Sequence, residues 1–440
     1  MIGLLGAALA AAVVLVAGGF PGRVMAAGVV GRTAGSFLAG AVALHLGLTL
    51  SDRLGIAWSR PAILVVALLA TALWWLLGGG PQGDRRGRRG GPAPGWGLLL
   101  GALPVAVFAG LAAVHLAHTP DFVFHWGTKA ARWVAERGVD AELFAGDSGW
   151  RLNPGYPQLV PELMALPGLL LGGFVERAAL LVAPGVAAVS LLAWRHAAHS
   201  AGATGFELEV GTALAGAALG GFGFVHGGAG GADAVVAFAL LAGVAALVLR
   251  DRPAAVPTLA LAAALAAAAK TEGMTVAVLL LAVDAAVSVG HDGLRGAAKR
   301  LLLTAPAAMA VVALWWTFEG QLYLPNRASW PDLARLGRVV EAIGESAMRP
   351  EAGFQWIFLL ALPWCFTRRE LRAPAVVIGV QAVAFLAAFV VEPIDPAFLV
   401  VSTMPRLVSQ LVPAALLLTV LRSADASHGP PGVAGGKITS

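Results

Sequence analysis

Residues 118–167, HTPDFVFHWGTKAARWVAERGVDAELFAGDSGWRLNPGYPQLVPELMALP, form a polar stretch in which acids, bases, aromatics and prolines gather without a long hydrophobic run. Almost everything on either side of it is apolar. In a membrane protein, a polar loop between spans is a natural place for chemistry. We therefore expect this stretch to form the core of an active site facing away from the cytoplasm, with the rest of the chain as its scaffold.

The composition indicates an integral membrane protein. Of the 440 residues, 58% are hydrophobic and only 12% are charged, whereas soluble proteins carry about 25% charged residues. Apolar runs of ~20 residues recur along the chain, the length that a helix needs to cross the hydrocarbon core. Because the runs are continuous rather than alternating, they favour helices over a barrel. The predicted fold is an all-α, polytopic transmembrane helix bundle.

Thirteen apolar segments are interpreted as spans. They are residues 2–20, 30–50, 61–79, 96–116, 176–194, 208–226, 233–250, 254–269, 274–290, 301–318, 354–367, 373–391 and 405–421. Short basic clusters separate them, so the net charge of +5 reflects the positive-inside rule and indicates no nucleic-acid partner. The first segment lacks a basic region before its apolar run and is predicted to be retained. Cys365 is the only cysteine, which excludes an internal disulfide.

One further apolar segment, residues 156–173, is predicted not to cross. Crossing would turn every later basic cluster outward, and its three prolines make it a poor straight helix. It is interpreted as a juxtamembrane helix at the outer surface. The amino terminus is then outside and the carboxyl terminus is cytoplasmic.

This topology divides the chain into four regions. They are a three-span extension with a basic cytoplasmic loop (1–95), a core with the long outer loop 117–175 (96–300), the C-terminal spans with outer loop 319–353 (301–422), and a disordered tail (423–440).

Asp121 follows a predicted span directly, and we interpret it as a general base or a metal ligand. His125 and Lys129 lie four and eight residues further on, so on a helix all three share one face. The alternatives are a helix N-cap at Asp121 and a solvated interfacial face anchored by Trp126.

Four later positions also carry candidate residues. Tyr156 is either a site residue or an interfacial anchor, and Asp233 opens a span as a functional acid or an N-cap. Lys270 and Glu272, in KTEG, either hold a phosphate or pair with each other. Arg406 is predicted to begin the last span at the outer face, where it either binds phosphate or snorkels.

The order of these signals resembles the GT-C glycosyltransferases, integral membrane enzymes that use polyprenyl-phosphate-linked sugars. The resemblance extends over residues 96–421, and the spans before it look like an addition. Two departures are Phe122, where many relatives have a second acid, and ADAVVA, which lacks the family's proline. The segments that carry the resemblance are Asp121, 126–130, 155–173, 232–233, 270–273 and 405–413.

The resemblance implies a GT-C-like bundle that transfers a sugar, with inversion, on the periplasmic or exterior side of a bacterial inner or plasma membrane. Lys270, Arg406 or Lys129 would hold the donor phosphate, and Asp121 would take the proton of an acceptor hydroxyl on a glycan, lipid or protein. Metal use is left open, with Asp121 as the possible ligand of a divalent ion. The loop 319–353, with Tyr323, Arg327, Trp330 and Asp332, is expected to cover the site.

Two other classes remain open. A lipid-linked glycan ligase or polymerase shares this chemistry with a larger donor. A secondary transporter or lipid flippase is the second alternative, but transporters tend to contain internal repeats, and the two halves of this chain show no convincing repeat.

Overall fold

The structure is a computed structural model that describes residues 1–19, 28–77, 95–115, 121–140, 142, 156–226, 231–319, 333–348, 350–391 and 395–427. These residues are mostly helical and contain no β-strand, so the all-α prediction is confirmed for them. In chain order the helices are α1 (Ile2–Ala17), α2 (Gly28–Arg53), α3 (Arg60–Leu77), α4 (Trp96–His115), the π-helical turn η1 (Phe122–Trp126), α5 (Gly127–Glu136), α7 (Leu159–Leu171), α8 (Glu176–Leu180), α9 (Val182–Ser200), α10 (Gly205–His226), α11 (Asp233–Val248), α12 (Ala255–Ala269), α13 (Thr271–Glu319), α14 (Leu333–Ala347), α15 (Pro350–Leu360), α16 (Leu362–Cys365), α17 (Arg369–Val391) and α18 (Pro396–Ser427).

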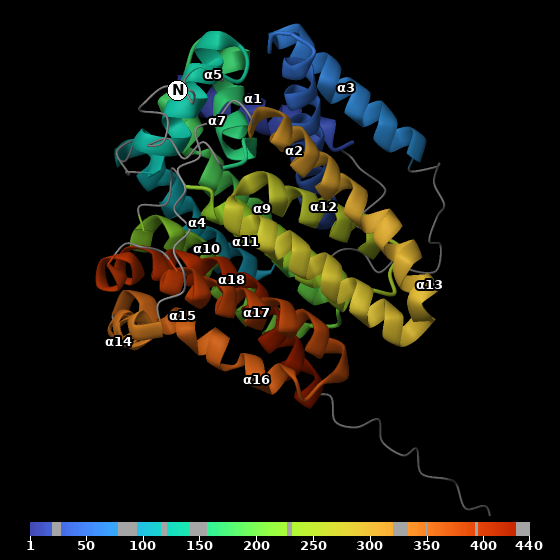
Figure 1. The fold of residues 1–440 in the computed structure, drawn as a ribbon, viewed down its shortest axis with the longest axis vertical. Helices are drawn as coiled ribbons and strands as arrows, with labels where there is room; N and C mark the ends of the chain where they lie inside the picture. The colour runs from blue at the N-terminus through green and yellow to red at the C-terminus, as the bar shows by residue number, and fades with distance from the viewer. Residues whose placement is uncertain are drawn as a thin grey trace, which may run out of the picture.

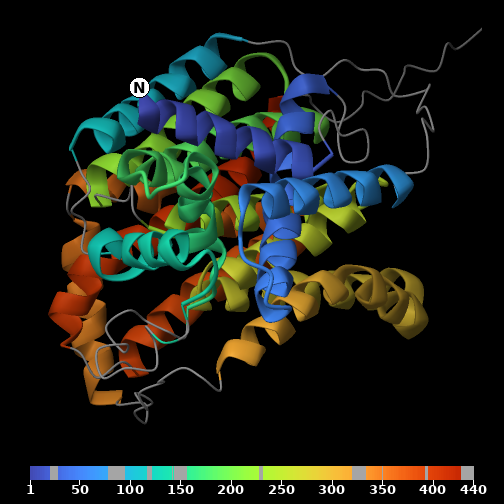
Figure 2. The ribbon, with the colours of Figure 1, turned by 90° about the horizontal axis from the view of Figure 1, so that it is seen from above.

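Helices α11 and α12 form the centre of the bundle. Side chains of α11 are buried from Asp233 to Leu247, and those of α12 from Leu259 to Ala269. Alanine dominates α12, favours helix and is small enough to let neighbouring helices approach closely. In Figure 1 the N-terminal helices α1 to α3 lie at one end of the molecule and α14, α15 and α16 at the other, with α9, α11 and α12 between them, and Figure 2 gives the view from above.

Small residues also set the packing of α4 against α10. A Cβ atom added to Gly216 would lie 2.1 Å from the carbonyl oxygen of Gly101, so the two backbones are in direct contact. Such an approach requires glycine and is common where helices associate in membranes.

Six helical segments among the described residues are long and apolar enough to cross a membrane, judged by length and composition. Six more apolar helices of 10–17 residues occur in the same part of the chain. A multi-pass membrane protein fits these helices, whereas the count of thirteen spans stays a prediction.

Helix α13 contains a sharp reversal that fits the two spans predicted at 274–290 and 301–318. Gly293 breaks the helix with φ 69° and ψ −175°. Arg300 donates from Nε to both carboxylate oxygens of Asp284, at 2.8 and 2.7 Å, across 16 residues that would extend ~24 Å along a straight helix. The first half of α13 therefore folds back on the second (Figure 1).

The segment predicted as a juxtamembrane helix is α7, and it is helical as expected. Its side chains are buried from Leu159 to Leu169, and α1, α2, α5, α8 and α12 pack around it. Pro161 lies in its first turn, where a missing N–H costs little. The helix is thus packed inside the protein, and its place at the outer side of a membrane stays a prediction.

Two regions outside the predicted spans are partly helical. The predicted outer loop 319–353 includes α14 and the start of α15, and the segment 392–404, between the predicted spans 373–391 and 405–421, includes the first turns of α18. Arg406 therefore lies ten positions inside a helix rather than at its beginning. Helix α18 also continues to Ser427, so the predicted disorder is wrong for 423–427. Residues 428–440, and Tyr323, Arg327, Trp330 and Asp332, lie outside the described part of the chain.

Candidate functional site

Asp233, the first residue of α11, is the centre of a buried charged cluster. Its side chain accepts hydrogen bonds from Nε of Arg406 at 2.9 Å and from Nε2 of Gln410 at 2.7 Å, both on α18. Nζ of Lys270, in the break between α12 and α13, lies 3.5 Å away. The N-cap position of α11 is Ala232, and Asp233 is the first residue inside the helix, so the N-cap alternative does not describe its role. A carboxylate that is only 4% exposed instead neutralises two cations.

Arg406 joins this centre to Asp121. One of its terminal nitrogens lies 2.8 Å from Asp233 and also donates to a carboxylate oxygen of Asp121. Asp121 immediately precedes η1 without capping it, and its side chain is 27% exposed against 5% for that of Asp233. Of the two carboxylates on Arg406, Asp121 is therefore the one that an incoming molecule can reach. The snorkelling alternative for Arg406 is wrong, because its guanidinium points at two acids.

Lys270 completes the charged group. Besides Asp233, it contacts Glu272 at 3.1 Å, as the internal-pair alternative proposed. Burial would lower the pKa of Lys270, but the Asp233 and Glu272 carboxylates outweigh it and hold that pKa above its ordinary value. Lys270 is thus a fixed positive charge at neutral pH.

Two stacked aromatic rings lie beside the charged cluster. The Trp126 and Tyr156 rings are stacked, with centroids 5.4 Å apart and planes 9° from parallel. Nζ of Lys270 lies 5.8 Å from the Tyr156 centroid, and Nζ of Lys129 lies 5.5 Å from the Trp126 centroid. Both distances suit cation–π attraction. Trp126 is 1% exposed and is therefore not an exposed interfacial anchor. Tyr156 is half-buried, its ring lies between Trp126 and Lys270, and burial raises its pKa to about 12.

The π-helical turn η1 changes the predicted helical face. A π-helix closes its hydrogen bonds over five residues instead of four. The residues after Asp121 therefore do not follow the 3.6-residue period of an α-helix, on which the prediction was based. Trp126 and Lys129 are fully buried, whereas His125 is only half-buried. The expectation that Asp121, His125 and Lys129 form one continuous face is therefore corrected. Trp126 takes the inward position next to Lys129.

Gln410 was not singled out in the sequence, although it follows Arg406 by one helical turn in PRLVSQL. That spacing places the two side chains on one face of α18 and was the available signal. Two acceptors of the cluster, Oε1 of Gln410 and Oε2 of Glu272, are buried without a hydrogen-bond partner among the described residues. Buried acceptors of this kind suit the hydroxyl groups of a ligand.

The charges decide what the cluster can bind. Asp121, Asp233 and Glu272 face two cations, Lys270 and Arg406. An anion that binds Arg406 competes with these carboxylates, and Asp121 is the more exposed of the two that contact it. A metal ion fits this arrangement poorly, because a guanidinium contacts both aspartates. No group of three metal-ligating side chains occurs in the described ranges.

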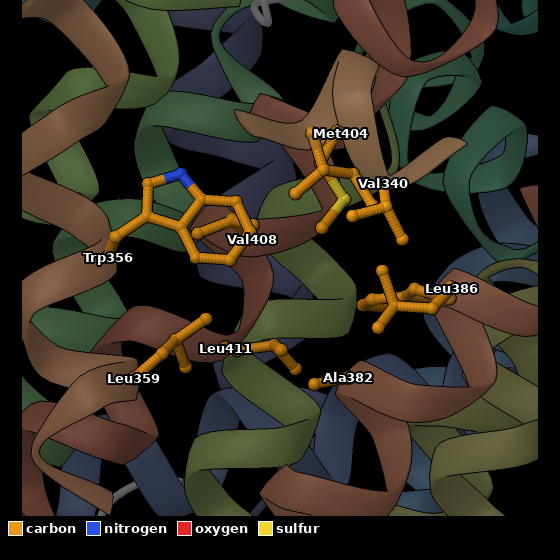
Figure 3. A pocket seen from close by; sticks show the side chains of 10 residues that line it. Val340, Trp356, Leu359, Ala382, Leu386, Met404, Val408 and Leu411 are labelled. Atoms are coloured by element: carbon orange, nitrogen blue, oxygen red, sulfur yellow. The ribbon is translucent and has the colours of Figure 1, made fainter. Parts of the chain in front are cut away.

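An apolar cavity of about 210 Å³ lies between α14, α15, α17 and α18. Trp356, Leu386, Met404 and Val408 are among its lining side chains (Figure 3). Met404 and Val408 lie two positions before and after Arg406, and positions two apart point to opposite sides of a helix. The body of α18 therefore separates this cavity from the charged cluster.

Comparison with known proteins gives no relative: no family model, no curated protein and no solved structure matches this chain. The cluster itself is therefore the basis for inferring a function.

Proposed function

We propose that the protein is a membrane glycosyltransferase of the GT-C type, which transfers a sugar from a polyprenyl-phosphate donor to an acceptor hydroxyl. One observation carries the proposal. Side chains from five separate segments, including Asp121, Asp233, Lys270, Tyr156 and Arg406, converge in one partly accessible cluster within an otherwise apolar bundle. Ionisable groups are expensive at membrane depth and mark functional sites.

The donor phosphate takes the place of Asp121 on Arg406. A guanidinium matches phosphate geometry through two parallel hydrogen bonds, and Lys270 adds a second positive charge nearby. Asp233 and Gln410 keep Arg406 in position while its other partner changes. The unpartnered oxygens of Glu272 and Gln410 accept hydrogen bonds from sugar hydroxyls.

Displacement from Arg406 frees Asp121 to act as the base. Asp121 takes the proton of the acceptor hydroxyl as its oxygen attacks the anomeric carbon, and the bond between that carbon and the phosphate oxygen breaks. The polyprenyl phosphate leaves with the electron pair of that bond, and the anomeric configuration inverts. Arg406 and Lys270 stabilise the charge that develops on the leaving phosphate, which is where most of the rate effect arises. No step requires a metal ion.

The experiment is a thermal-shift assay of purified protein with polyprenyl phosphates and their monosaccharide conjugates. A ligand that binds only the folded state raises the melting temperature. We expect a shift with the lipid phosphates that is lost in Arg406→Ala and reduced in Lys270→Ala. Arg338→Ala, on the exposed side of α14, is the matched control and should keep the shift. Folded protein that shifts with no lipid phosphate contradicts the proposal and favours the transporter class.

A further inference from the structure

The N-terminal helices α1 to α3 contain none of the candidate site residues, yet α2 reaches the elements that carry them. His45 and Thr49 of α2 both contact Glu162 of α7. Nδ1 of His45 lies 2.7 Å from Oε2 of Glu162, and the Thr49 hydroxyl donates to Oε1 at 3.1 Å. All three residues are 3% exposed. A polar group buried this deeply in an apolar bundle is tolerated because its partners are fixed in place.

A second set of contacts joins the end of α2 and the turn after it to the end of α5. Oδ1 of Asp52 accepts the backbone N–H of Val139 at 2.9 Å, and the backbone N–H of Trp58 donates to the carbonyl of Arg137 at 2.6 Å. The Trp58 ring meets the Trp133 ring edge to face, with centroids 5.9 Å apart. These contacts attach α5 and the turn after it to α2 and the α2–α3 turn at two separate points.

Both rings of the aromatic stack belong to the elements held in this way. Trp126 immediately precedes α5, and Tyr156 lies three positions before α7, next to Gln158, whose side chain donates to the Tyr156 carbonyl at 2.6 Å. Asp121 lies immediately before η1, which is continuous with α5. Arg406 and Asp233 instead lie on α18 and α11. The site therefore has two halves. Helix α2 contacts the first through α5 and α7, and it reaches the second through Phe37, whose ring lies 5.8 Å from that of Phe238 on α11.

We infer that α2 and the α2–α3 turn act as a positioning clamp. The clamp holds Asp121, Trp126 and Tyr156 in register with Arg406 and Asp233, with His45 and Glu162 as its buried positioning residues. Its geometry stands on the contacts above, whereas the reaction that it serves rests on the proposed function.

The test measures the distance between the two halves by pulsed electron paramagnetic resonance. Spin labels at Val123 on η1 and Phe398 on α18, both exposed, report on it in a Cys365→Ala background. Because breaking one partner of a buried pair can prevent folding, the test variant is His45→Leu with Glu162→Leu, which replaces both by apolar groups. The control is Ser36→Ala, a buried α2 residue that packs against Gly18 of α1.

We expect a narrow distance distribution in the parent protein and in Ser36→Ala, and a broadened or displaced one in the double leucine variant. The single variant His45→Gln keeps Glu162 and a hydrogen-bonding side chain at position 45. Its distance distribution should therefore stay close to that of the parent protein. An unchanged distribution in a folded double variant overturns the clamp.

A kinetic measurement separates the clamp from the proposed reaction. With a donor and acceptor that the parent protein uses, misalignment should lower kcat roughly ten- to hundredfold while KM changes little. If the parent protein transfers no sugar but the label distances respond, the clamp stands and the proposed function falls. If transfer occurs and both kcat and the distances are unchanged in the double variant, the clamp falls alone.

Discussion

Asp233 balances the positive charges of the cluster, because Arg406, Lys270 and Gln410 all contact its carboxylate. Lys270 is 6% exposed and Gln410 is fully buried, so these groups have little water to replace that partner. The arrangement stabilises the protein only as a complete set, since a buried charge left without its partner costs far more than the pair contributes.

Asp233→Asn should therefore destabilise the protein by about 3–5 kcal/mol, because two buried cations lose their shared anion. Thermal unfolding in detergent measures the change. Asp251→Asn, at an exposed position in the turn between α11 and α12, provides the comparison and should have almost no effect. Equal melting temperatures for the two variants would show that Asp233 does not hold the cluster together.

Asp121→Asn, unlike Asp233→Asn, should leave stability almost unchanged and should lower activity. Asp121 is partly exposed and Arg406 keeps Asp233 as a partner, so the melting temperature should change little. Sugar transfer should fall by at least ~10²-fold, since an amide cannot take the acceptor proton. Initial rates measure this loss, with Glu136→Gln of α5, whose side chain is 52% exposed, as control. Full activity in Asp121→Asn would remove this residue from the mechanism.

Lys129 should make stability depend on pH. Burial lowers its pKa in the folded protein to about 7 from an ordinary value of 10.5. Between these two values the unfolded chain binds more protons than the folded one, so stability should rise as pH increases from about 7 to about 10. Melting temperatures across this range, compared with those of Lys129→Met, measure the effect. A parent and variant with the same slope would contradict the lowered pKa of Lys129.

The types of residue at the site could be predicted from the sequence, but their partners could not. Asp121, Asp233, Lys270, Glu272 and Arg406 stand out because charges at span ends are rare in so apolar a chain. The bond between Asp121 and Arg406 joins positions 285 residues apart. Such a contact depends on how the helices pack, which no local pattern encodes.

At the scale of elements, Gly293 gives α13 its reversal. Its combination of φ 69° and ψ −175° belongs to a region of backbone geometry that is essentially restricted to glycine. Asp284, 1% exposed, then pairs with Arg300 of the second half, and its Oδ1 lies 3.7 Å from Nε of Arg250, in the turn after α11. The reversal and the ion pairs support each other.

Gly293→Ala should accordingly lower the free energy of unfolding by about 1–3 kcal/mol. Gly290→Ala is a matched control, because a Cβ atom at either position meets open space within 4 Å and only Gly293 has a positive φ. Alanine at position 290 should be neutral or slightly stabilising in its helix. Similar melting temperatures for both variants would contradict the strain attributed to Gly293.

Element boundaries were less predictable than element type. The predicted spans 373–391 and 405–421 left a loop between them, yet α18 begins at Pro396 and passes through Pro405 and Pro413. Packing against α11, α10, α14 and α17 supports the helix along its length. Likewise, η1 shifts the register after Asp121, and the sequence carries no simple signal for a π-helical turn.

At the scale of the whole molecule, the apolar composition predicted a helical, multi-pass bundle, and the described residues agree with it. The number of spans was harder to predict from the sequence, because several buried helices such as α12 are only 15 residues long. Burial within the protein makes a segment as apolar as contact with lipid does. Hydropathy alone therefore cannot separate a short central helix from a span.

The most direct test of the whole account is the affinity for a polyprenyl phosphate of the parent protein and of Asp121→Asn. If phosphate displaces Asp121 from Arg406, removing that carboxylate's charge should tighten binding by roughly three- to tenfold, even though transfer is lost. Arg406→Gln should lose binding. If folded Asp121→Asn binds the lipid phosphate no better than the parent protein, the exchange of partners on Arg406, and with it the proposed site, is contradicted.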